Sequence, residues 1–156
     1  MRFPLYLLYP LYTGAIVLVM IAVVPRERIR RLAVFGVIYG GLGDALVLLI
    51  LFILNIAGYR NYGPFAFLGL PFFPPLAWSA YFIIFLHLLP ERYPWNYVFT
   101  LAAAGYSIVF SKVLQNLGLF QWKSSSILPP LIVYFIWMMV AVFTYQRFFR
   151  ETTIDS

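Results

Sequence analysis

The amino-acid sequence predicts an all-α membrane protein, a bundle of five transmembrane helices that forms a single domain over residues 1–156. Hydrophobic residues make up 63% of the chain and charged residues only 10%, whereas soluble domains carry roughly 25% charged residues. Apolar runs of about 20 residues, the length that crosses a bilayer, recur five times along the chain. We therefore expect the exterior of the protein to contact membrane lipids.

The first two helices are expected at residues 5–24 and 32–57. The first ends at Val23-Val24-Pro25-Arg26 without the small-residue cleavage site of a signal peptide, so it should be retained. A basic run from Arg26 to Arg31 connects it to the second helix. Within the second helix, the spacing of Gly36 and Gly40 is typical of a face that another helix approaches closely.

The third helix is expected within residues 65–90 and should be broken by proline at its start. Pro71, Pro74 and Pro75 each lack a backbone donor. Regular helix should therefore run from about Pro75 to Leu89, which is short for a full span. The preceding stretch, 65–75, either lies at the membrane interface or enters the membrane as a re-entrant element covered by protein.

The fourth helix is expected at 97–120 and the fifth at 127–147. The fifth opens with Ser124-Ser125-Ser126 followed by Pro129 and Pro130, which is a helix-start pattern. Ring-bearing residues near the segment ends are expected to form an aromatic belt at headgroup depth. They include Tyr6, Tyr9, Tyr59, Tyr62, Tyr93, Trp95, Tyr97, Trp122, Phe148 and Phe149.

The distribution of basic residues predicts a cell membrane protein, of the inner membrane in a bacterium, with its N-terminus outside and its C-terminus cytoplasmic. Seven basic residues fall on one side and three on the other, and the richer side is normally cytoplasmic. The seven are Arg26, Arg28, Arg30, Arg31, Arg92, Arg147 and Arg150, and the three are Arg2, Arg60 and Lys123. Because these charges lie at segment ends rather than along one groove, no nucleic-acid partner is expected.

Two charged residues fall at membrane depth, Asp44 in the second helix and Lys112 in the fourth. A charge at the bilayer centre costs about 2.5–3.5 kcal/mol and needs a partner. The two residues lie at similar depths, so an ion pair between them is reasonable if the helices are neighbours. Such a pair either fixes helix register or belongs to a binding site.

Amide side chains near these charges favour a site for an ion, a proton or a small polar ligand. Gln115 and Asn116 lie on the Lys112 face at i+3 and i+4. Asn55 falls on nearly the same face as Asp44 if the second helix continues that far. The candidate ligand- or ion-binding residues are therefore Asp44, Lys112, Gln115, Asn116 and Asn55.

His87 is the only histidine, and Glu91 follows it by one helical turn near the expected cytoplasmic end. The two residues are an interfacial pair or a candidate proton relay. One histidine with distant carboxylates predicts no metal site, and neither a catalytic motif nor a cofactor is expected.

The segment Pro74-Pro75-Leu76-Ala77-Trp78-Ser79-Ala80-Tyr81-Phe82 resembles the proline–tryptophan helix start of the tryptophan-rich sensory proteins, the translocator family. This resemblance implies a five-helix protein that binds porphyrins or lipids, with Trp78 and Tyr81 as candidate aromatic contacts to a ligand. The family carries the motif at its second helix, whereas here it falls at the third. Otherwise the chain resembles the many small multi-pass bacterial membrane proteins without assigned activity.

Three functions are consistent with these features. The first is a non-enzymatic membrane protein that binds a small ligand, or transports a solute or proton, through the Asp44/Lys112 region. The second is an accessory or assembly subunit that binds another membrane protein or its own copies. The small size of the chain and its glycine-lined helix faces favour this function. The third is a lipid-modifying enzyme that uses His87 and Glu91.

Overall fold

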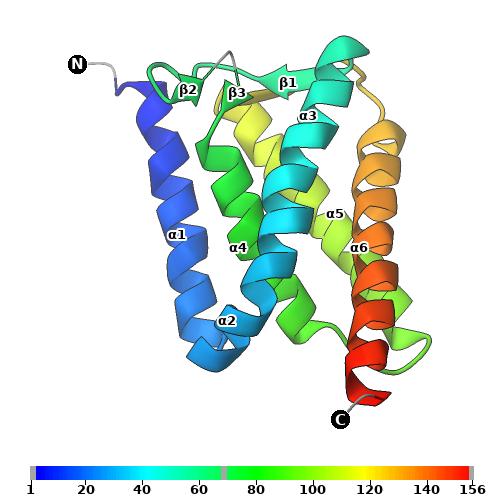
Figure 1. Cartoon of the computed structure of the whole chain (residues 1–156). Helices are drawn as coiled ribbons and strands as arrows, with labels where there is room; N and C mark the ends of the chain where they lie inside the picture. Colours follow the sequence, from blue (N-terminus) through cyan, green and yellow to red (C-terminus); the bar gives the residue numbers. More distant parts are fainter. Residues whose placement is uncertain (1–2, 68–69, 155–156) are drawn as a thin grey trace.

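The computed structural model describes residues 3–67 and 70–154, with side chains up to residue 148. Five helical passes run side by side between two ends of the molecule, and two antiparallel strand pairs cap one end (Figure 1). Four passes are long and apolar enough to cross a membrane, namely Leu5–Val23, Arg26–Ile53, Trp95–Asn116 and Leu128–Phe148. The described chain is thus mainly α-helical, as expected, with a small β cap that the sequence did not predict.

The first pass consists of a 3₁₀ turn, Leu5–Leu7, and helix α1, Leu8–Val23, close to the expected 5–24. The Tyr9 side chain is fully buried. Its hydroxyl lies 2.5 Å from the carbonyl oxygen of Arg60 and 2.8 Å from that of Leu119. Tyr9 therefore joins α1 to the strand cap, and its expected place in an aromatic belt is wrong.

The second pass is one continuous helix made of α2 (Arg26–Phe35), a π-helical segment (Gly36–Leu42) and α3 (Gly43–Ile53). The expected range 32–57 is wrong at both ends. The basic run is helical because arginine favours helix and Pro25 suits the residue just before its start. The helix stops early because Asn55 adopts a left-handed φ of 57°, after which strand β1 (Ala57–Tyr59) begins.

The third pass is helix α4, Phe73–Leu88. It starts slightly earlier than expected, because Pro74 and Pro75 lie in the first turn, where no backbone donor is needed. Strands β2 (Ala66–Phe67) and β3 (Leu70–Pro71) precede it as an antiparallel pair at the strand-capped end. Residues 68–69, within the proposed re-entrant stretch 65–75, lie outside the described residues. Helix α4 is short, yet its side chains are largely buried because α1, α2 and the π-helical segment pack on it.

The last two passes are α5, Trp95–Asn116, and α6, Leu128–Ile154. Helix α5 ends before the expected residue 120, because Gly118 takes a left-handed φ of 76° and strand β4 (Phe120–Trp122) follows. Strand β4 pairs antiparallel with β1, with Ala57 opposite Trp122. Helix α6 continues beyond the expected Arg147. Strands of two or three residues are too short to show a period in the sequence.

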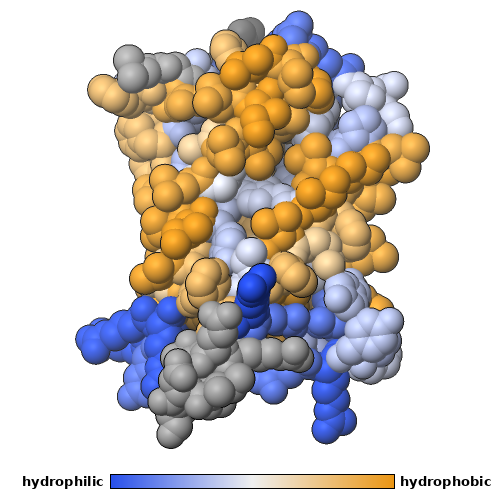
Figure 2. Space-filling view, turned by 45° about the vertical axis from the view of Figure 1, so that its right-hand side comes forward, coloured by the Kyte–Doolittle hydropathy of each residue, from blue (hydrophilic) through white to orange (hydrophobic). Residues whose placement is uncertain are grey.

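The molecular surface separates apolar sides from charged ends (Figure 2). The described arginines of the richer side lie at the α1–α2 turn, the α4–α5 connection and the last turns of α6, all at the end opposite the strands (Figure 1). Between the ends, α1, α3, α5 and α6 expose large apolar side chains, including Leu18, Leu46, Val109 and Phe143. Several apolar helices with such a surface suit membrane insertion. Arg2 and the Arg150 side chain, both counted in the charge balance, lie outside the described residues.

Candidate functional site

The glycine face of the second pass holds α4 at backbone contact. A Cβ atom added to Gly40 would lie 2.4 Å from the carbonyl carbon and oxygen of Trp78. One added to Gly36 would lie 2.6 Å from Ile83 Cγ1 and 2.8 Å from the carbonyl oxygen of Ser79. The expected close helix approach at Gly36 and Gly40 is thus confirmed, and its partner is α4. This contact sets the position of Trp78.

The π-helical segment also attaches the second pass to α6. Trp137 donates a hydrogen bond from Nε1 to the carbonyl oxygen of Tyr39, at 2.9 Å. The Tyr39 hydroxyl is hydrogen-bonded to that of Thr144. Gly43 leaves room for the indole, because a Cβ there would lie 2.8 Å from Trp137 Nε1. Asp44, the next residue, is thereby held beside α6.

Asp44 lies inside the bundle, as expected, but it meets no cation there. Its side chain is 3% exposed, and its Oδ2 atom has no hydrogen-bond partner. It lines a chamber of about 20 Å³, which we call the Asp44 chamber. The other lining residues are Val47, Leu48, Leu51, Tyr59, Trp78, Phe120, Trp122, Val133, Tyr134 and Trp137. A space of that size holds one water-sized group.

The structure does not join Asp44 to Lys112. No ion pair links the two residues, both of which are described, and Lys112 is half-buried and does not line the chamber. The second pass packs mainly on α4, whereas α5 packs mainly on α6. Gln115 is half-buried with an unpartnered Oε1, and Asn116 is exposed. The expected polar cluster around Asp44 is therefore not assembled.

Asn55 lies away from the Asp44 face because the helix ends before it. Its exposed side chain accepts a hydrogen bond from Lys123 Nζ at the strand-capped end. His87 and Glu91 lie toward the opposite end of the molecule. His87 is half-buried with an unpartnered Nδ1, and Glu91 is exposed. No ion pair joins these two described residues. Within the described part of the chain, no three His, Asp or Glu residues group as metal ligands.

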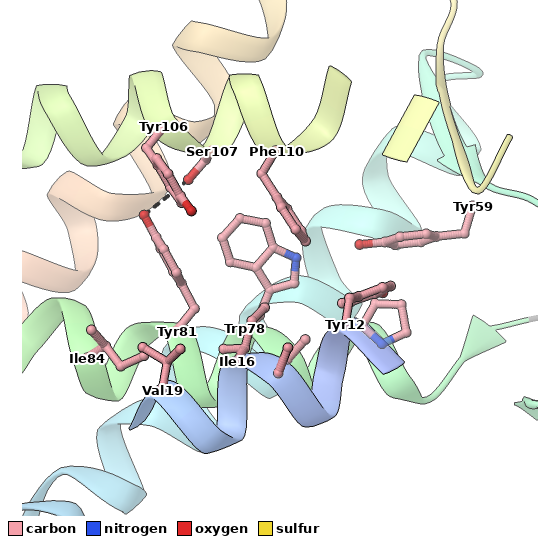
Figure 3. Close-up of a pocket in the computed structure, with 13 residues that line it drawn as sticks. Tyr12, Ile16, Val19, Tyr59, Trp78, Tyr81, Ile84, Tyr106, Ser107 and Phe110 are labelled. Carbon is pink, nitrogen blue, oxygen red and sulfur yellow. Dashed lines mark hydrogen bonds between the residues drawn. The ribbon is translucent and has the colours of Figure 1, made fainter. Parts of the chain in front are cut away.

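Trp78 and Tyr81 line a second, larger space of about 360 Å³ between α1, α4 and α5, which we call the α1/α4/α5 cavity (Figure 3). The other lining residues are Tyr12, Ala15, Ile16, Val19, Tyr59, Pro74, Ala77, Ile84, Tyr106, Ser107 and Phe110. Its volume lies within the range of small-molecule sites, about 300–1,000 Å³. Tyr59 and Trp78 also line the Asp44 chamber, so the two spaces meet at these rings.

The cavity wall is aromatic, with a few polar atoms. Ser107 donates a hydrogen bond to the Tyr81 hydroxyl at 3.3 Å, and that hydroxyl lies 3.2 Å from the carbonyl oxygen of Ala103. The buried Tyr12 hydroxyl has no partner. Burial raises the pKa of Tyr59 well above its ordinary value, so its hydroxyl stays protonated at neutral pH. Such a wall can bind an apolar molecule and orient it with a small number of hydrogen bonds.

The cavity opens at its side. Helix α1 packs chiefly on α4 and α5 chiefly on α6, and across the cavity the rings of Tyr12 on α1 and Phe110 on α5 lie 5.7 Å apart between centroids. Val19 and Tyr106, which line the cavity from these two helices, are 50% and 64% exposed. Both helices present apolar side chains to the exterior here. An apolar molecule could therefore enter without crossing a polar surface.

Comparison of this chain with protein-family models, curated proteins and solved structures finds no match. The likeness of residues 74–82 to tryptophan-rich sensory proteins stays a prediction. The structure nevertheless places both residues singled out by that likeness, Trp78 and Tyr81, in the wall of the larger cavity.

The sequence did not point to several cavity residues. Tyr59 and Trp122 were expected in an aromatic belt. Instead, Trp122 is 3% exposed, and Tyr59 lines both the Asp44 chamber and the α1/α4/α5 cavity. Tyr12 and Tyr106 come from helices distant in sequence from Trp78. A hint was present in the repeated tyrosines of the first helix, yet aromatic content alone does not show which rings face inward.

Proposed function

We propose that this protein is an integral membrane protein that binds a small, largely apolar molecule in the α1/α4/α5 cavity. The observation that carries the proposal is the 360 Å³ aromatic cavity with an unpartnered Tyr12 hydroxyl in its wall. Buried polar atoms without partners are uncommon, and a ligand or ordered water normally satisfies them. The side opening between α1 and α5 favours a ligand that enters from the lipid.

We also propose that the arginine-rich end faces the cytoplasm, with the N-terminus outside. The α1–α2 turn carries four exposed arginines, whereas Arg60 and Lys123 lie at the strand-capped end. Basic residues are retained on the cytoplasmic side during insertion. A reporter that fluoresces only in the cytoplasm should be active when it is fused after Ser156. A reporter that functions only in the periplasm should be active when it is fused to the N-terminus. The reverse pattern would contradict this orientation.

Movement of a solute or proton through Asp44 and Lys112 has less support, because the two residues lie on passes that pack on different neighbours. The accessory-subunit and lipid-modifying functions stay predictions. For the latter, His87 and Glu91 do not line the cavity. Ligand binding accounts for more of the geometry with fewer assumptions.

Filling the cavity tests the proposal. Ala15→Phe should weaken binding of 2-phenylethanol by about tenfold or more, because the new ring would occupy the space offered to the ligand. Binding is measured by equilibrium dialysis of radiolabelled 2-phenylethanol against protein in a mild detergent, with empty micelles subtracted. The matched control is Leu18→Phe, which places the same ring on α1 at a site 68% exposed and outside the cavity lining.

Leu18→Phe should bind 2-phenylethanol like the unmodified protein. Saturable binding that is equal in both variants would place the ligand elsewhere. Uptake that never exceeds that of empty micelles would remove the proposal.

A further inference from the structure

We propose that the Asp44 chamber receives an ammonium group, and that the ligand of this protein is an amine whose apolar part occupies the α1/α4/α5 cavity. The placement of the apolar part in this cavity rests on the proposed function. The ammonium group could also come from a free ammonium ion, and the experiment below separates the two sources. Three features of the chamber carry the inference: its unpartnered acid, its wall and its size.

The acid of the chamber lacks a partner. Asp44 is 3% exposed, and none of its described neighbours forms an ion pair or a side-chain hydrogen bond with it. A buried carboxylate without a partner is unfavourable, because neither water nor a counter-charge compensates its lost hydration. The other polar side-chain groups that line the chamber are the hydroxyls of Tyr59 and Tyr134 and the indole N–H groups of three tryptophans, none of which is a cation. A cation in the chamber would supply the missing counter-charge.

The wall of the chamber suits a cation. Six of its lining residues are aromatic, and their rings form a connected group around the acid. Trp78 lies 4.8 Å from Trp137 and 5.7 Å from Tyr134 between ring centroids, and Trp122 lies 6.1 Å from Tyr134. Aromatic faces attract cations through their quadrupoles, more strongly where water is excluded. No lysine or arginine lines the chamber.

The size of the chamber selects the cation. A volume of about 20 Å³ accepts one nitrogen with its hydrogens but not a trimethylated nitrogen. The carbon skeleton of an amine must then lie outside the chamber. The α1/α4/α5 cavity adjoins it at Tyr59 and Trp78 and offers 360 Å³ of largely apolar space. An amine that spans both spaces would lie against both of these rings.

Trp122 allows one competing occupant. Its buried Nε1 lacks a hydrogen-bond partner, and an N–H group cannot donate to an ammonium group. A water molecule could accept from Trp122 and donate to Asp44. In that case an amine would bind no better than an alcohol of the same shape, so the comparison of the two ligands distinguishes the occupants.

The experiment compares 2-phenylethylamine with 2-phenylethanol, which share a carbon skeleton, by equilibrium dialysis against the full chain in mild detergent. The amine should bind about tenfold more tightly than the alcohol. Asp44→Asn should abolish this difference and leave binding of the alcohol unchanged, which also shows that the variant is folded. Glu91→Gln, which changes an exposed acid outside both spaces, should retain the difference.

Two competitors identify the source of the ammonium group. Ammonium chloride that displaces the amine, where tetramethylammonium chloride does not, indicates that the chamber also takes the free ion. Failure of both salts to compete indicates that only an amine with an apolar part is bound. Either result supports an ammonium group in the chamber. The competition is measured only after the amine has been found to bind more tightly than the alcohol in the unmodified protein and not in Asp44→Asn.

The outcomes against the inference are distinct from those against the proposed function. Equal binding of amine and alcohol, or an advantage that persists in Asp44→Asn, overturns the ammonium site while cavity binding stands. If neither compound binds, the proposed function fails. The chamber is then tested with ammonium chloride alone, which should raise the thermal unfolding temperature of the unmodified protein but not of Asp44→Asn. No difference would overturn the ammonium site as well.

Discussion

Replacing Gly40 with alanine is expected to lower the free energy of unfolding by about 3 kcal/mol. The new Cβ would lie 2.4 Å from the carbonyl carbon and oxygen of Trp78 and 2.5 Å from the amide nitrogen of Ser79. These are backbone atoms within α4, so no side-chain rotation relieves the overlap. The second pass and α4 would have to separate along their whole contact.

The effect is measured by unfolding the protein from detergent micelles with increasing dodecyl sulfate, followed by tryptophan fluorescence. Gly105→Ala is the matched control, because a Cβ on that helical glycine would have no heavy atom within 4 Å. Alanine favours helix over glycine by about 1 kcal/mol, so the control should be neutral or slightly more stable. Equal losses in the two variants would show that Gly40 does not hold α4 by close approach.

Replacing Asp44 with leucine is expected to raise the free energy of unfolding by about 1–3 kcal/mol in the absence of ligand. The carboxyl is buried in an apolar chamber without a hydrogen-bond partner for Oδ2, so it opposes folding. Leucine removes the polar group and extends toward the empty space beside it. The same titration with dodecyl sulfate measures the change.

The control for this variant is Glu91→Leu, at an exposed acid, which should change stability by less than about 0.5 kcal/mol. A loss of stability in Asp44→Leu would mean that the carboxyl already has a stabilising partner, and the need for a cation would disappear. A gain would mean that the chain carries a destabilising acid at this position. Residues of that kind are typical of binding sites, where stability is given up for function.

The helical passes could be predicted because each signal is local. Length and apolar composition decide whether a segment can be a spanning helix, and they placed α1, α5 and α6 within several residues of their observed ends. Two of the errors, at the ends of α3 and α5, fall where a backbone conformation, not composition, ends the helix. Asn55 and Gly118 take left-handed φ angles, and the strands that follow them pair with each other across the chain. Pairing between segments more than 60 residues apart leaves no trace in either one alone.

The candidate site was predicted in part. The inward position of Asp44 followed from its spacing to Gly36 and Gly40, since residues four apart share a helix face. Its partner could not be predicted in this way. Lys112 has a suitable depth, but α4 rather than α5 occupies the glycine face, and aromatic residues surround the carboxyl instead.

By itself the sequence determined that the chain forms long apolar helices, that one glycine face meets another helix, and that Asp44 lies buried among them. The tertiary structure alone decided which helices are neighbours, and hence that α1, α4 and α5 enclose a cavity beside the Asp44 chamber. The physical reason is that helix periodicity sets the direction of a side chain around its own axis. What the side chain meets depends on the packing of other segments, which close contacts such as that of Gly40 with Trp78 select.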